Sequence, residues 1–191
     1  MKPPPHFFGY GSLVNTATHD YLDPQPARLS GWQRSWCHTA LRDVAFLTVV
    51  PAPDAQIDGL IAAVPGADWQ ALDQREFAYA RLPAKDTIRH NLASESEMQP
   101  EISFYAVPQD AQTAGSQHHP ILLSYLDVVV QGYLQVFGEV GVSDFFATTA
   151  GWEAPILNDR SAPLYPRHQS LTPVESQLVD HHLASLGALL V

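Results

Sequence analysis

Cysteine, basic side chains and long apolar runs are all scarce in this sequence of 191 residues. The single cysteine, Cys37, excludes an intrachain disulfide and is typical of a reducing compartment. No apolar run approaches the roughly 20 residues that a membrane span needs. The proline-rich start at 3–5 is not followed by the apolar segment of a secretory signal. We therefore expect a cytoplasmic protein that has no membrane partner.

The charge balance is strongly acidic. Ten lysines and arginines stand against 20 aspartates and glutamates, which gives a net charge of −10. An acidic surface repels phosphate backbones, so we expect no nucleic acid partner, although a locally basic pocket for a small acidic substrate remains compatible. Apolar residues make up 46% and charged residues only 16% of the chain, which is not the composition of a disordered protein.

The nine histidines lack the spacing of a metal site. Neither His-x-x-x-His nor His-Glu-x-x-His occurs, and the adjacent pairs at 118–119 and 181–182 would point about 100° apart on a helix. A nucleophilic pair formed by Cys37 and His38 is disfavoured, because neighbours in a strand face opposite sides. We therefore expect no metal.

Strand-like runs dominate the first 107 residues. Prolines at 51 and 53 are expected to end the third run, and a helix that begins after Asp68 interrupts the series. The order contains no regular β–α–β alternation and indicates an α+β fold. The expected strands are His6–Tyr10, Arg28–Ala40 with a kink at Gly31, Val44–Val50, Ile57–Val64, Tyr79–Leu82 and Glu101–Val107.

Helical spacing dominates the second half. It runs from Pro120 to Phe137, and we expect a break at Gly141 and a short helix at 144–149. Thr172 and Glu175 form a capping box around Pro173 and predict a last helix that ends at Gly187. Polar loops are expected at 93–100 and 109–119.

A glycine-bracketed tyrosine follows the first strand, at residues 9–11, with Ser12 after it. Glycine allows close approach of a ligand, and the backbone amides can then act as fixed donors. The loop lacks the third glycine of a dinucleotide fingerprint, the Gly-Lys of a phosphate loop and the second glycine of a nucleophile elbow. On these residues alone, a tight turn and a ligand-binding loop are both open.

A carboxylate lies among the expected inward residues of the helix after position 68. At about 100° per residue, Trp69, Leu72, Glu76 and Tyr79 fall within an arc of about 80°. Burial there raises the pKa of a carboxyl group, which suits acid–base catalysis near neutrality. The alternative is a structural ion pair between Glu76 and one of three arginines: Arg28, Arg42 and Arg81.

The irregular segment 151–169 carries tryptophan, tyrosine and two arginines. Arginine matches a carboxylate with two parallel hydrogen bonds, so Arg160 and Arg167 are candidate ligands of a substrate carboxylate. The alternative is that Asp159 pairs with one of these arginines and holds the loop in place.

The order of these motifs resembles the γ-glutamylcyclotransferase superfamily, which includes the ChaC-like proteins. The resemblance rests on the strand that leads into residues 8–13, the strand at 59–62, and Leu72-Asp73-x-x-Glu76-x-x-Tyr79. It implies a small, partly closed mixed β-barrel flanked by helices. We expect this domain at 6–150, with a C-terminal loop and helix at 151–191 packed on it.

The resemblance also implies a reaction. The α-amine of a γ-glutamyl group attacks its own side-chain carbonyl and releases 5-oxoproline from a small γ-glutamyl amine or peptide, as in glutathione metabolism, without a cofactor. Glu76 is then the general acid and base. The expected substrate contacts are Tyr10, Gly11, Ser12, Leu13, Tyr79, Arg160 and Arg167.

Two other functions stay open at this point. A non-catalytic module can hold a small carboxylated ligand with the same loop and arginines, and a hydrolase on the same scaffold gives glutamate in place of 5-oxoproline. The apolar end at 183–191 packs either on the barrel or on a second subunit, so a homodimer is a possible partner state.

Overall fold

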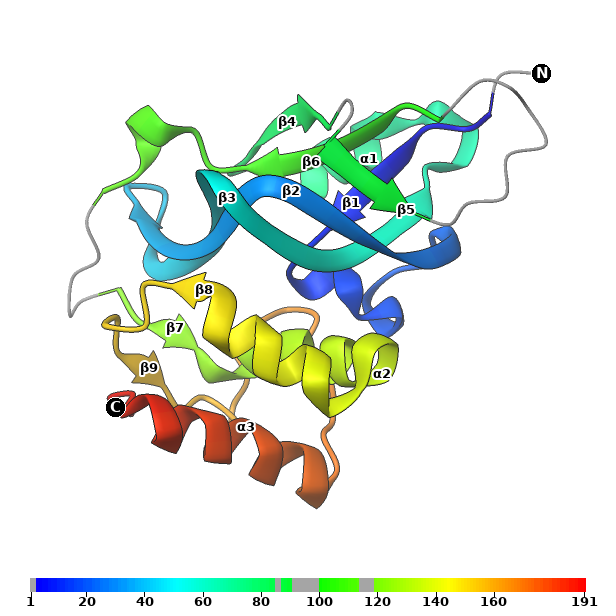
Figure 1. The fold of residues 1–191 in the computed structure, drawn as a ribbon. Helices are drawn as coiled ribbons and strands as arrows, with labels where there is room; N and C mark the ends of the chain where they lie inside the picture. Colours follow the sequence, from blue (N-terminus) through cyan, green and yellow to red (C-terminus); the bar gives the residue numbers. More distant parts are fainter. Residues whose placement is uncertain (1–2, 85–86, 91–99, 114–118) are drawn as a thin grey trace.

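The protein consists of a curved sheet on one side and a helical layer on the other (Figure 1). The computed structural model describes residues 3–84, 87–90, 100–113 and 119–191, so parts of the predicted loops at 93–100 and 109–119 lie outside the described residues. The helices are α1 (Trp69–Arg75), α2 (Leu123–Thr148) and α3 (Pro173–Leu186). The strands are β1 (His6–Gly9), β2 (Leu22–Thr39), β3 (Arg42–Ala63), β4 (Ala80–Pro83), β5 (Ile88–His90), β6 (Ile102–Ala106), β7 (Ile121–Leu122), β8 (Thr149–Ala150) and β9 (Ile156–Leu157).

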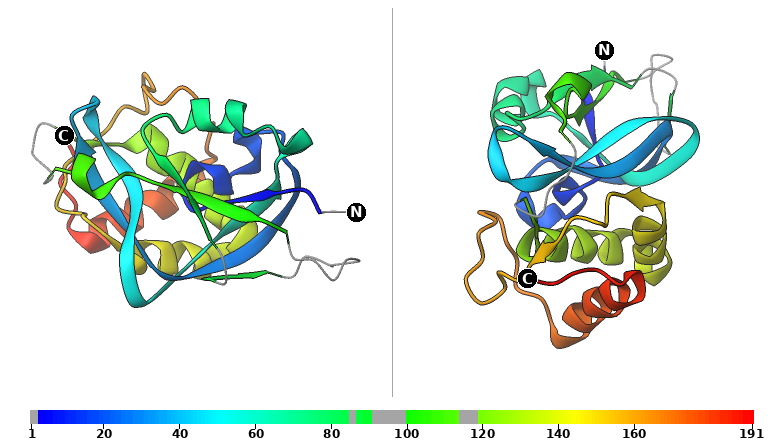
Figure 2. Two further views of the ribbon diagram at one scale, coloured as in Figure 1. Left: turned by 90° about the horizontal axis from the view of Figure 1, so that it is seen from above. Right: turned by 90° about the vertical axis from the view of Figure 1, so that its left-hand side faces the viewer.

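Within the described residues, the main sheet has the strand order β4-β6-β1-β3-β2-β5, and β8 pairs with β2. Strand β1 runs antiparallel to β3 and parallel to β6. The loop after β1 therefore leaves the sheet from an inner strand. The curled sheet lies over α2, and α3 packs on the far side of α2 (Figure 2). This arrangement confirms the predicted α+β class with a partly closed sheet and flanking helices.

A long hairpin of β2 and β3 forms most of the sheet, and here the predicted strand ends are wrong. Strand β3 is continuous through Pro51 and Pro53, where an end was expected. Ser30 pairs with Gln56 and Trp32 pairs with Pro51, so residues 52–55 face only the single residue between. Pro53 lies within this register shift, where no ladder N–H donor is needed, which is why a proline is tolerated there.

Helix α2 bends where glycine allows it, three residues before the predicted break. Gly138 has φ 67° and ψ −169°, a conformation outside the helical region. Gly141, the predicted break, lies within the helix instead, and glycine is needed there because a Cβ would lie 2.1 Å from the Cβ of Phe137. The short strands β5, β7, β8 and β9 were not predicted, since two or three residues carry no readable alternation.

The core lies between the sheet and α2. It combines aromatic and aliphatic residues from β1, β3, β6 and α2, among them Phe7, Phe104, Leu126 and Phe145. Within the described part of the chain, no helix is long and apolar enough to cross a membrane.

The start of α3 confirms the predicted capping box. The Thr172 hydroxyl accepts from the Glu175 amide at 3.3 Å, and Glu175 accepts from the Thr172 amide at 2.6 Å. Gly187 ends the helix in the left-handed conformation, with φ 66°. This helix packs on α2, and Glu175 also accepts from Gln131 of α2 at 3.2 Å.

We predict that Thr172→Ala lowers the free energy of unfolding by about 1 kcal/mol, since the first turn loses its side-chain acceptor. Urea denaturation followed by circular dichroism measures this change. Thr172→Ser is the matched control and keeps the wild-type midpoint. Equal midpoints for the alanine and serine variants would contradict the cap.

Candidate active site

The loop after β1 is held in place by close backbone contacts. A Cβ at Gly9 would lie 2.5 Å from the Leu13 Cβ, and one at Gly11 would lie 2.6 Å from the Tyr125 hydroxyl. The chain then forms a short 3-10 turn at Ser12–Val14, and Gly132 of α2 packs against the residue that follows it. These contacts explain why the loop needs glycine at positions 9 and 11.

A buried hydrogen-bond chain orients the first peptide group of the loop. The Tyr133 hydroxyl lies 3.0 Å from the Tyr10 carbonyl oxygen and 2.7 Å from the Asp58 carbonyl oxygen. Arg34 donates from Nη1 to both the Tyr133 hydroxyl at 2.8 Å and the Asp58 carbonyl at 2.9 Å. Because a trans peptide points its C=O and N–H in opposite directions, holding the Tyr10 carbonyl here turns the Gly11 N–H the other way.

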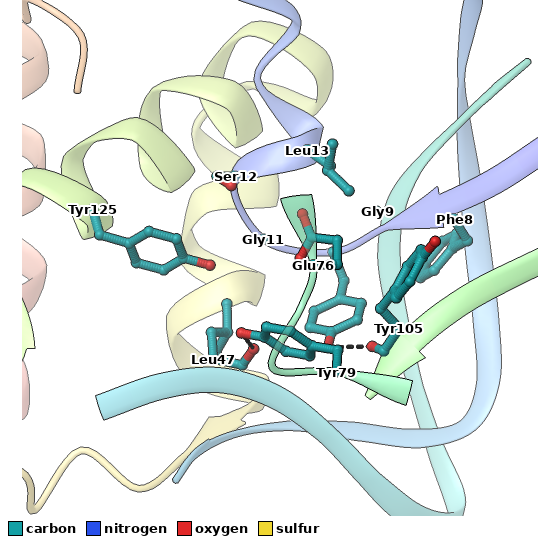
Figure 3. A pocket seen from close by; sticks show the side chains of 11 residues that line it. Phe8, Gly9, Gly11, Ser12, Leu13, Leu47, Glu76, Tyr79, Tyr105 and Tyr125 are labelled. Atoms are coloured by element: carbon teal, nitrogen blue, oxygen red, sulfur yellow. Dashed lines mark hydrogen bonds between the residues drawn. The ribbon is translucent and has the colours of Figure 1, made fainter. Parts of the chain in front are cut away.

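The loop forms one wall of a small pocket, which we call the inner pocket (Figure 3). Two tyrosines of its walls are held by the sheet: Tyr10 donates to the Tyr105 carbonyl at 2.6 Å, and Tyr79 donates to the Leu47 carbonyl at 3.0 Å. The lining residues are Phe8, Gly9, Tyr10, Gly11, Ser12, Leu13, Leu47, Glu76, Tyr79, Tyr105 and Tyr125.

Glu76 enters this pocket from the end of α1, which differs from the predicted geometry. The helix stops at Arg75, and Glu76 is its C-cap residue with φ −99° and ψ 34°. The prediction that Glu76 and Tyr79 belong to the helix is therefore wrong. Tyr79 reaches the pocket through a turn in which its amide donates to the Glu76 carbonyl at 2.8 Å. Figure 3 shows the Glu76 carboxylate pointing toward the loop.

The surroundings of Glu76 favour its protonated form more than water does. Its side chain is 17% exposed, and burial raises its pKa above the ordinary value of 4.5. Two arginines act in the opposite direction: Arg75, whose Nε lies 3.2 Å from Oε1, and Arg167. The net effect is a raised pKa, because desolvation is the largest contribution.

The three arginines considered as structural partners of Glu76 have other partners instead. Arg28 binds Asp58, with Nε 2.6 Å from Oδ1, and Arg81 lies 3.6 Å from Asp73. The Arg42 guanidinium lies over the Phe77 ring at 4.9 Å from its centre. The ion-pair partner of Glu76 is instead its neighbour in sequence, Arg75.

A second, larger pocket, which we call the outer pocket, adjoins the inner one. Both are lined by Ser12, Leu47, Glu76, Tyr79 and Tyr125, so these residues form the neck between them. The other residues of the outer pocket are Arg42, Val44, Ala45, Phe46, Arg75, Phe77, Ala78, Leu122, Leu164, Tyr165, Pro166 and Arg167.

The structure separates the two arginines of the segment 151–169. Arg167 lines the outer pocket, whereas Arg160 lines neither pocket. Arg160 makes two hydrogen bonds of 2.7 Å to Asp127 of α2 and a third of 2.7 Å to Asp180 of α3. The guanidinium of Arg160 thus joins the two helices and lies away from the candidate site.

Asp159 takes neither of the arginine partners proposed for it. It accepts from the Ser124 amide at 2.7 Å and from the Ser124 hydroxyl at 2.5 Å, at the start of α2. It also accepts from the Leu164 amide at 2.9 Å. The loop that carries Tyr165 and Arg167 over the outer pocket is therefore held to the N-terminus of α2.

Sequence reasoning missed several residues of the pocket walls, among them Tyr105, Tyr125 and Arg42. A tyrosine within an apolar helical stripe is a usable signal, because its hydroxyl needs a polar partner when buried. Burial raises the pKa of Tyr125 well above its ordinary value, while hydrogen bonding from the Ser12 amide acts in the opposite direction. The Tyr125 hydroxyl therefore faces the loop amides as a neutral group.

Other reactive groups lie outside the pockets. Burial raises the pKa of the Cys37 thiol to about 12, so it is protonated at neutral pH. His38 bonds the Thr113 hydroxyl through Nδ1 at 2.6 Å. Among the residues that the structure describes, no group of three His, Cys, Asp or Glu side chains is placed to hold a metal ion.

Solved structures share this fold at low sequence identity. A structure described as "Gamma-glutamyl cyclotransferase" is 12% identical with a TM-score of 0.59, over 94% of this chain and 99% of that one. An uncharacterized protein of Homo sapiens, loc79017, is 13% identical with a TM-score of 0.59, over 92% of this chain and 97% of that one. YkqA of Bacillus subtilis is 18% identical with a TM-score of 0.53, over 78% of this chain and 57% of that one.

These likenesses establish that the chain has the γ-glutamylcyclotransferase-like fold, as the motif order predicted. No protein-family model matches the sequence, and the comparison with curated proteins gives no significant match. At these identities the likeness concerns the fold, and the chemistry has to be argued from the pocket.

We predict that Tyr133→Phe lowers the free energy of unfolding by about 1–3 kcal/mol, because the buried Tyr10 carbonyl and Arg34 each lose a partner. Urea denaturation measures the change. Tyr21→Phe is the control, since it also removes one hydroxyl but from a half-buried ring at the surface of the core. If the Tyr133→Phe variant were as stable as the control, the hydrogen bonds of the Tyr133 hydroxyl would not hold the loop.

Proposed function

We propose that this protein is a γ-glutamyl cyclotransferase that releases 5-oxoproline from a small γ-glutamyl amine or peptide, with Glu76 as general acid and base. One observation carries the proposal: Glu76 and the glycine loop line the same small pocket. The likeness of the fold to a structure described as a γ-glutamyl cyclotransferase supports it.

The glutamyl group would occupy the inner pocket. There the amides of Gly11 and Leu13 act as fixed donors to the carboxylate and to the γ-carbonyl oxygen, while the Ser12 amide holds the Tyr125 hydroxyl. The neutral Tyr125 hydroxyl faces the same loop and adds a donor. Because the ring closure is intramolecular, holding the α-amine against the γ-carbonyl supplies a large part of the rate.

The proposed reaction balances without water or cofactor. The α-amine nitrogen attacks the γ-carbonyl carbon and forms the ring C–N bond, while Glu76 takes a proton from that nitrogen. The loop amides stabilise the negative charge on the carbonyl oxygen. The original amide C–N bond then breaks, and Glu76 returns the proton to the leaving nitrogen. A carboxyl group with a raised pKa suits both steps, since it can accept and donate near neutral pH.

We predict that Glu76→Gln lowers the rate of 5-oxoproline release by at least about 100-fold, because glutamine cannot accept the proton. Mass spectrometry of mixtures with γ-glutamyl dipeptides, γ-glutamylamines and glutathione measures the product. Asp68→Asn is the matched control on the same helix, since asparagine also caps a helix. Full activity in a folded Glu76→Gln protein would exclude Glu76 as the base.

The same assay separates the other two functions. Release of glutamate in place of 5-oxoproline identifies a hydrolase. Ligand-dependent stabilisation without any product across the whole panel identifies a binding module.

The pH profile tests the environment of Glu76. The base must be ionised, so a raised pKa places the acid limb of kcat/KM above pH 4.5. Arg75 lowers this pKa, and Arg75→Gln therefore moves the acid limb to higher pH. Arg89→Gln removes the same charge from β5, which lines neither pocket, and leaves the limb in place. A limb that stays or moves to lower pH in Arg75→Gln would contradict the assignment.

A further inference from the structure

We infer that the leaving group of the proposed reaction carries a carboxylate on an apolar body, and that Arg167 binds this carboxylate in the outer pocket. The preferred substrates are then γ-glutamyl amino acids whose carboxylate is free, and γ-glutamylamines are poor substrates. This inference rests on the proposed function, because it concerns the other half of the same substrate.

The arrangement of the two pockets determines where the leaving group goes. Glu76 lies at the neck, where both pockets meet. If the glutamyl group fills the inner pocket and Glu76 protonates the leaving nitrogen, that nitrogen lies at the neck. Everything attached to it then extends into the outer pocket.

The walls of the outer pocket are largely apolar and aromatic. Phe77 and Leu164 both line this pocket and are 57% and 60% exposed, so a bound group can cover them. Phe46, Leu122 and Pro166 continue the same surface. A leaving group with an aliphatic or aromatic body would cover this surface and remove it from water.

The charge of the outer pocket is opposite to that of the whole protein. In a chain with only 10 basic residues and a net charge of −10, three arginines line it: Arg42, Arg75 and Arg167. Among the described lining residues the only carboxylate is Glu76, and it is paired with Arg75. Arg42 and Arg167 form no ion pair with a described carboxylate, which leaves two positive charges to attract an anion.

Arg167 is the better placed of the two free arginines. It lines the outer pocket together with Glu76 and its guanidinium has no aromatic or carboxylate partner among the described residues, whereas Arg42 lies over the Phe77 ring. In a γ-glutamyl amino acid the carboxylate is only two bonds from the leaving nitrogen. Its partner must therefore belong to the outer pocket into which the neck opens, as Arg167 does.

A pair of substrates that differ only in this carboxylate tests the inference. These are γ-glutamylphenylalanine and γ-glutamylphenethylamine. We expect kcat/KM to be at least about tenfold higher for the first, in line with a charged hydrogen bond. Arg167→Gln reduces this ratio to near one. The ratio is the chosen readout because any effect of Arg167 on the Glu76 pKa is common to both substrates and cancels.

Arg89→Gln, which removes the same charge outside both pockets, keeps the wild-type ratio. A ratio near one or below one in the wild-type protein would overturn the inference, and so would a ratio that Arg167→Gln leaves unchanged. If no compound releases 5-oxoproline, the proposed function fails. The inference is then decided by isothermal titration of both compounds into the wild-type protein, where a tenfold preference for the carboxylate that is lost in Arg167→Gln supports it and equal affinity overturns it.

Discussion

The buried guanidinium of Arg34 connects the sheet, the long helix and the candidate site. Its side chain is almost fully enclosed, and among the described residues it has no carboxylate partner. Its hydrogen bonds run to Tyr133, to the Asp58 carbonyl, and to the hydroxyls of Thr148 and Thr149 at the end of α2, where the helix dipole favours a cation. Burying a charge is costly unless its donors are satisfied, so this network restricts how β2, β3 and α2 can pack. The Tyr10 carbonyl belongs to the same network through Tyr133.

The environment of Glu76 follows from this framework. The loop held by Tyr133 closes one side of the inner pocket, and the end of α1 places Glu76 on another. Burial and the nearby arginines act on its pKa in opposite directions, and burial prevails. The same arginines give the outer pocket its positive charge, so one set of side chains would bear on both the proposed proton transfer and the proposed choice of leaving group.

Local patterns in the sequence predicted the parts of the structure that depend on neighbouring residues. The capping box at Thr172 is an example, because its hydrogen bonds join residues three apart. Glu76 was found through a helical pattern although the helix ends before it, since the following turn keeps the same side chain inward. Arg160 could not be placed, because its partners Asp127 and Asp180 lie on two helices that meet only in the fold. The pairing of Arg34 with Tyr133, which are 99 positions apart, has no local signal either.

In the proposed mechanism, the glutamyl group binds in the inner pocket with its reacting atoms between Glu76 and the loop. A crystal structure of the Glu76→Gln variant with γ-glutamylphenylalanine measures this directly. We expect the α-amine nitrogen to lie within hydrogen-bond reach of the residue 76 side chain, at about 3 Å. The γ-carbonyl oxygen should face the backbone amides of the loop. A glutamyl group bound outside this pocket, or with its amine turned away from residue 76, would contradict the proposed mechanism.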